Sequence, residues 1–61
     1  MPDPKALLAR MLADTHRKRG VEDIDELALL VVQDLVSDDL VSYAEAPAWR
    51  EIIAADLRRA G

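Results

Sequence analysis

Residues 24–36 read Ile-Asp-Glu-Leu-Ala-Leu-Leu-Val-Val-Gln-Asp-Leu-Val, and this apolar stretch decides the fold. When the residues are placed at about 100° per residue, the apolar side chains other than Leu30 cover an arc of roughly 200°. A helix that lies on a single neighbour needs only about half that width. We therefore predict a central helix that contacts two other helices and has apolar surface left over for a partner.

The segment before this helix carries clear signals for a helix of its own. Asp3 is a good N-cap residue, and Pro4 suits the first helical position. Gly20 is expected to end the helix as the residue with a left-handed backbone. Helical spacing places five side chains on one stripe, which we expect to face the core: Leu7, Leu8, Met11, Leu12 and Thr15.

The segment after the central helix predicts a break and then a final helix. Asp38 and Asp39 would enter the apolar arc if the helix continued, so we expect Ser37 to cap a short extra helix. Pro47 is expected in the first turn of the last helix, which runs to about Ala60. The sequence thus predicts one all-α domain over residues 1–61, a small bundle of three main helices with a short extra helix after Ser37.

Charge is distributed unevenly along the chain. Residues 1–20 carry a net charge of +3, residues 21–46 a net charge of −8 and residues 47–61 a net charge of +1, which together give −4. One interpretation is an acidic surface that meets a basic partner or imitates nucleic acid. The other is that the acids cap helices, face solvent and pair with the basic ends of the chain.

Several classes of function are poorly supported. The chain has no cysteine and one histidine, His16, which falls on the polar side of its helix and is interpreted as a solvated side chain. We expect no enzyme activity, cofactor or metal, because no nucleophile is spaced to work with His16 and no glycine-rich phosphate loop or calcium-loop spacing is present. Nucleic-acid binding is not expected of a chain with a pI near 4.7.

No membrane segment is expected either. The longest apolar run, Leu27–Val32, has six residues, whereas a membrane-spanning helix needs about 20. The N-terminus shows no basic stretch followed by an apolar one, so we expect a cytoplasmic protein.

Tyr43 and Trp49 are the only aromatic side chains. A Trp in a small helical domain either fills the core or anchors an interface, because Trp and Tyr are enriched in binding hot spots. Asp56 falls within the apolar face of the last helix, so we expect it at the edge of the core, where it reaches a basic group. The side chains that we expect to contact a partner are Leu29, Leu30, Val32, Val36, Tyr43, Trp49 and Asp56.

Residues 9–22 read Ala-Arg-Met-Leu-Ala-Asp-Thr-His-Arg-Lys-Arg-Gly-Val-Glu. This segment resembles the inhibitory helix of VbhA-like antitoxins, which partner Fic-domain AMP-transferases. The motif of that family is Ser or Thr, three residues, Glu, then Gly or Asn, and Thr15 and Gly20 stand at the matching positions. Arg19 takes the place of the inhibitory glutamate and should repel the arginine of the toxin's ATP site. The resemblance therefore implies an antitoxin that binds its toxin without that mechanism.

Taken together, these features predict a non-enzymatic protein-binding module, regulatory or inhibitory, such as an antitoxin or a small phage-type inhibitor. Two alternatives stay open at this point. The chain could be a structural subunit that forms homo-oligomers through the central helix, or an acidic mimic of nucleic acid. The expected partner is accordingly another protein or a second copy of this chain.

Overall fold

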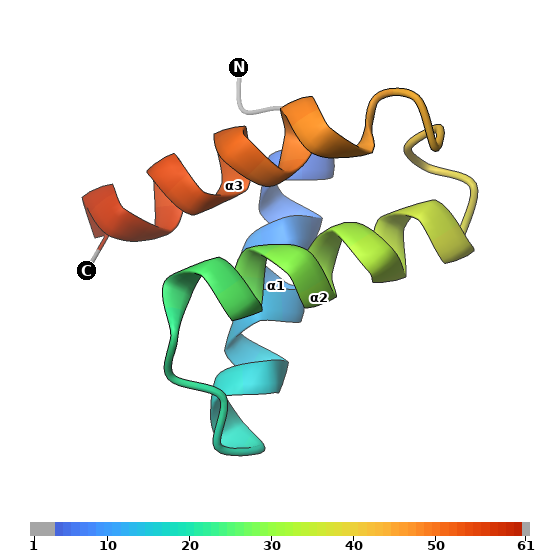
Figure 1. Cartoon of the computed structure of the whole chain (residues 1–61). Coiled ribbons are helices and arrows are strands. Elements are labelled where there is room, and N and C mark those ends of the chain that lie inside the picture. Colours follow the sequence, from blue (N-terminus) through green and yellow to red (C-terminus); the bar gives the residue numbers. More distant parts are fainter. Residues whose placement is uncertain (1–3, 61) are drawn as a thin grey trace.

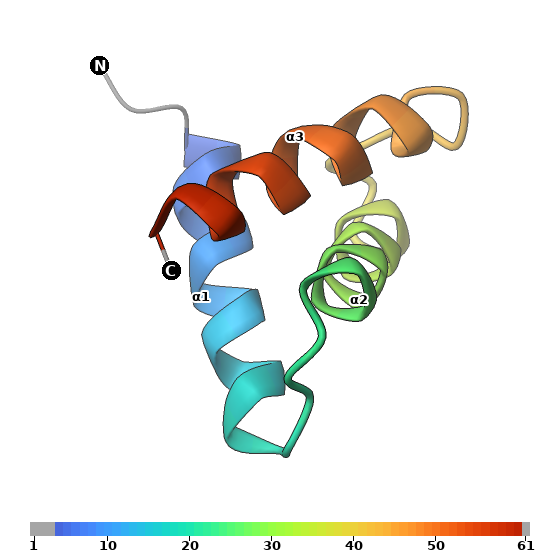
Figure 2. The same ribbon diagram turned by 60° about the vertical axis from the view of Figure 1, so that its left-hand side comes forward.

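The computed structural model describes residues 4–60, which form three helices: α1 (Pro4–Lys18), α2 (Ile24–Ser37) and α3 (Ala46–Ala60). Helices α2 and α3 run antiparallel beside each other, and α1 crosses them on one side (Figure 1). Figure 2, turned by 60°, shows the three helices around a shared interior. No strand forms within residues 4–60, so the predicted all-α bundle of three main helices is confirmed.

Helix α2 supplies the centre of the core, as its wide apolar arc predicts. Leu27, Val31 and Leu35 are fully buried and are the largest side chains to be so. They recur at a spacing of four residues and therefore lie along one face of the helix. Around them pack the other buried apolar side chains, Ala9, Ala13, Ala28, Val32, Val41, Ile53, Ala54 and Leu57.

Helix α1 meets the core with a different face from the one that the sequence favours. Its buried residues are Ala9 and Ala13, whereas Leu7, Met11 and Thr15 are exposed. The prediction that the Leu and Met stripe faces the core is therefore wrong for its outer members. Small side chains let two helix backbones approach closely, and α1 packs through its alanines while Leu8 and Leu12 fill the edges of the contact.

The end of α1 is confirmed at Gly20, whereas its predicted start at Asp3 lies outside the described residues. Gly20 has a φ of +103°, which is the backbone region that favours glycine. Its N–H donates to the carbonyl of Arg17 at 3.0 Å, and the N–H of Val21 donates to the carbonyl of His16 at 3.2 Å. This pair of bonds is a Schellman motif, which satisfies carbonyls that the helix end leaves free.

The predicted short helix after Ser37 does not form. Residues 38–45 form turns instead, and α2 ends in a second Schellman motif with Asp39 in the left-handed position at a φ of +59°. The N–H of Asp39 donates to the carbonyl of Val36 at 3.1 Å, and that of Leu40 to the carbonyl of Leu35 at 2.9 Å. This reversal turns the chain so that Val41 enters the core.

Ser42 makes the type of capping hydrogen bond that the sequence suggests for Ser37, but it caps a turn and not a helix. Its Oγ accepts a hydrogen bond from the backbone N–H of Glu45 at 3.2 Å and donates to Glu45 Oε1 at 2.8 Å. The spacing Ser-x-x-Glu is the one used in capping boxes, and here it shapes the turn that leads into α3. Pro47 lies in the first turn of α3, as expected.

Replacing Asp39 by glycine is expected to stabilise the domain by about 1 kcal/mol, because a side chain at positive φ is strained and an acid at a helix C-terminus opposes the dipole. Urea titration followed by circular dichroism measures the change. Asp38→Gly is the matched control, since it removes the same charge from a residue with a φ of −90°. Equal effects of the two substitutions would show that the backbone of Asp39 carries no strain.

Candidate functional site

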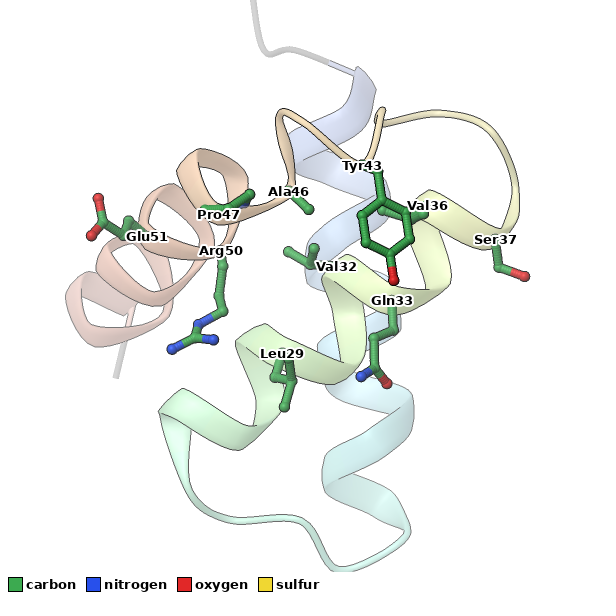
Figure 3. A pocket seen from close by; sticks show the side chains of 10 residues that line it. All are labelled: Leu29, Val32, Gln33, Val36, Ser37, Tyr43, Ala46, Pro47, Arg50 and Glu51. Atoms are coloured by element: carbon green, nitrogen blue, oxygen red, sulfur yellow. The ribbon is translucent and has the colours of Figure 1, made fainter.

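An apolar groove runs between α2, the start of α3 and the linker that joins them. Its volume is about 740 Å³, and no residue of α1 lines it. Figure 3 shows the side chains between α2 and α3, with Glu51 and Ser37 at the two margins pointing away from the others. We name it the α2–α3 groove; its lining residues are Leu29, Val32, Gln33, Val36, Ser37, Tyr43, Ala46, Pro47, Arg50 and Glu51.

The groove exists because α2 has more apolar surface than α1 and α3 cover. Val32 is buried at its floor, and Val36 packs half-buried against the core beside it. Leu29 stays 39% exposed, and Tyr43 on the linker is 86% exposed. Large apolar side chains gathered in one concave surface are typical of places where another molecule binds.

Four of the seven predicted contact residues meet in this groove: Leu29, Val32, Val36 and Tyr43. Leu30 does not join them, and it is also absent from the side chains packed against the core. It lies half-buried on a different side of α2. The structure therefore separates Leu30 from the predicted contact surface.

The sequence prediction missed the side of the groove that α3 provides. Pro47, Arg50 and Glu51 line this side, and their spacing of three and four residues places them on one face of the helix. That spacing is visible in the sequence. That this face borders a groove depends on α3 lying antiparallel along α2, which cannot be predicted from the spacing alone.

Trp49 and Asp56 lie at a second, smaller depression between α1 and α3, with a volume of about 130 Å³. Trp49 is half-buried and packs against the core, and the ammonium nitrogen of Lys5 lies 5.6 Å from its ring centre. A cation over an indole ring is a favourable contact. Trp49 thus closes the edge of the core, which leaves only part of its surface available to a partner.

Asp56 reaches a basic group within the fold, as expected, and that group is Arg10. The guanidinium donates through Nε to Oδ2 at 2.9 Å and through Nη2 to Oδ1 at 3.0 Å, a bidentate geometry that links α1 to α3. The hydrogen bonds from Arg10, together with its positive charge and that of Arg59, hold the pKa of Asp56 below its ordinary value of 3.8, although partial burial acts in the opposite direction.

Arg10→Gln is expected to lower the Tm at pH 7 by roughly 2–4 °C, because a surface ion pair contributes little to a small domain. A carboxyl with a lowered pKa contributes its stability above pH 3.8 and loses it as the pH falls through the folded-state value. The difference in Tm from the unmodified protein should therefore shrink below pH 3.8. Lys18→Gln, at the exposed Asp14 pair, is the control. A difference that stays constant down to pH 2 would contradict this assignment.

His16 is not the solvated side chain that the sequence suggests. It is half-buried, and its Nε2 lies 2.8 Å from Oδ2 of Asp34. The contact joins the last turn of α1 to the last turn of α2. His16 therefore has a structural role between two helices, which the helical projection of α1 alone cannot show.

The residues of the antitoxin-like motif lie together at the exposed C-terminal end of α1. Thr15 donates its hydroxyl to the carbonyl of Met11 at 3.0 Å, while Arg19 and Gly20 are exposed just beyond the helix. None of the three lines the α2–α3 groove. A partner that bound these three residues would therefore contact the C-terminal end of α1 and not the α2–α3 groove.

Comparisons with known proteins found no match among family models, curated proteins or solved structures. Within the described part of the chain, no three His, Asp or Glu side chains come close enough to form a metal site. None of the helices over residues 4–60 has the length and apolar character needed to cross a membrane.

Proposed function

We propose that this protein is a non-enzymatic binding module whose α2–α3 groove receives an apolar segment of another protein. The observation that supports this most is the exposure of Leu29 and Tyr43 beside a core that is already complete without them. Aromatic and aliphatic side chains in a concave surface are the usual anchors of protein interfaces. A regulatory or inhibitory role, such as that of an antitoxin or a small phage-type inhibitor, is the form of this function that the sequence favours.

The test is affinity capture from cells that produce the protein, with a groove variant and a matched control. Leu29→Ala with Tyr43→Ala removes two exposed anchors from the groove and should weaken binding by about 2 kcal/mol or more, which is roughly 30-fold. Met11→Ala with Ile52→Ala removes two exposed apolar side chains outside it and should leave binding unchanged. Equal capture by both double variants would exclude the groove.

Formation of homo-oligomers is the second candidate, because α1 also exposes apolar side chains. Leu7 and Met11 lie one turn apart on its outer face, and Met11 is 68% exposed. Self-association would cover this surface. Light scattering across a range of concentrations tests it, and the mass of a monomer at high concentration would rule this candidate out.

A further inference from the structure

Negative charge is concentrated on the linker beside one end of the α2–α3 groove. Asp38 and Asp39 directly follow the lining residue Ser37, and Glu45 directly precedes the lining residue Ala46. Residues 38–46 contain no basic side chain. Three carboxylates therefore lie on the linker that carries Tyr43, whereas Arg50 lies towards the Leu29 end of the groove and Glu51 points away on the outer side of α3 (Figure 3).

Aspartate at positions 38 and 39 is unfavourable for the stability of the isolated domain. They stand at the C-terminal end of α2, where the helix dipole is negative and where cations stabilise a helix. Asp39 also has the positive φ that glycine prefers. Among the residues that the structure describes, no cation pairs with either carboxylate. Positions where several local rules are broken at once are expected at functional sites.

We infer that the occupant of the groove is an amphipathic helix of a partner protein whose apolar stripe ends in a group of Lys or Arg side chains. The stripe covers Leu29, Val36 and Tyr43, and the basic group meets Asp38 and Asp39. This inference rests on the proposed function and adds the chemistry of the partner. The basic side chains belong at the Tyr43 end because Arg50, which lies towards the Leu29 end, would repel them there.

A helix suits this surface better than an extended peptide. A helix satisfies its own backbone N–H and C=O groups, whereas an extended peptide needs them paired by its host. Most residues that line the groove lie in α2 and α3, where backbone groups pair within the helix, so the groove offers no strand edge to an extended peptide. From Leu29 to Val36 the face of α2 spans about two helical turns, roughly 10 Å at 1.5 Å per residue. A partner helix of three or four turns covers that length and would add a fourth helix on the side away from α1.

Three synthetic peptides of roughly 14 residues test the inference against the full chain. All share a helix-forming sequence with Leu at spacings of three and four residues, and they differ only in a cluster at one end, which is Lys, Gln or Glu. Amide chemical shifts of the isotope-labelled protein report where each peptide binds and how tightly. We expect shifts at Leu29, Val36 and Tyr43, with the Lys peptide binding at least about tenfold more tightly than the Glu peptide at low salt.

Charge variants locate the source of that preference. Asp38→Asn with Asp39→Asn should remove most of the difference between the Lys and Glu peptides, and Asn tolerates the left-handed backbone at position 39. Asp14→Asn with Glu22→Gln changes the net charge equally at exposed sites that do not line the groove, so the preference should persist. A preference that falls equally in both variants would mean that only overall charge matters, which overturns the inference.

The remaining outcomes separate the inference from the proposed function. Binding of the Glu or Gln peptide in the groove as tightly as the Lys peptide overturns the basic partner and leaves groove binding in place. If no peptide shifts the groove signals, both ideas fail. Groove signals that move with protein concentration alone would identify a second copy of the chain as the occupant.

Discussion

Leu35→Ala is expected to destabilise the domain by about 3–5 kcal/mol. Leu35 is fully buried against its neighbours in the core, so the substitution loses the transfer free energy of the side chain and leaves a cavity. Small domains have unfolding free energies of about 5–15 kcal/mol, and a chain of this length falls towards the lower end. We therefore expect a variant that is partly unfolded at room temperature, measured by urea titration with circular dichroism.

Leu29→Ala is the matched control, since it makes the same chemical change in the same helix. Leu29 is 39% exposed at the groove, so less apolar surface is lost from the core and the expected cost is below about 1 kcal/mol. The loss in unfolding free energy should thus be several-fold larger for Leu35→Ala than for Leu29→Ala. Similar losses for both would show that Leu29 supports the fold, and the surface available to a partner would then be smaller than proposed.

Ala13→Leu is expected to destabilise the domain by about 1–3 kcal/mol, which is the usual cost of forcing a larger side chain into a packed core. Ala13 is only 1% exposed, where α1 meets the other helices. A leucine there must push α1 away or adopt a strained rotamer. Thermal unfolding followed by circular dichroism measures the loss.

Met11→Ala on the same helix provides the contrast, because Met11 is largely exposed. Its removal should change the free energy of unfolding by no more than about 0.5 kcal/mol. The opposite ranking, with Met11→Ala harmful and Ala13→Leu tolerated, would mean that α1 presents its large side chains to the core. That result would contradict the packing described for α1.

The three helices could be predicted from the sequence because their ends carry local signals. Gly20 and Pro47 mark a helix end and a helix start through backbone preferences that need no tertiary contact. The face that α1 buries could not be predicted in the same way. A helical projection favours the largest apolar side chains, whereas a close helix contact favours small ones such as Ala9 and Ala13.

The conformation of the linker also depends on tertiary packing and could not be predicted from local sequence signals alone. Ser37 and Ser42 are both reasonable capping residues by composition. What distinguishes them is that Val41 becomes buried, which requires the chain to reverse directly after α2. That requirement comes from packing between distant residues, so the sequence alone predicts an extra helix that does not form.

The candidate groove could be predicted on its α2 side and at Tyr43. The excess width of the apolar arc is a property of one helix, so Leu29, Val32 and Val36 follow from periodicity. Pro47 and Arg50 join the groove only because α3 lies antiparallel along α2. The second depression has a similar origin, since Arg10 and Asp56 are 46 residues apart and meet through the helix crossing.

Helix α2 carries several groove residues away from its fully buried face, although Val32 belongs to both the groove and the core. Leu29, Gln33 and Ser37 follow one another at intervals of four residues on the groove side, while Leu27, Val31 and Leu35 do so in the core. Exchanging the first set alters the shape and polarity of the groove without changing the second. If the groove binds a partner as proposed, mutation or selection can redirect the same scaffold towards different partners while the fully buried residues stay constant.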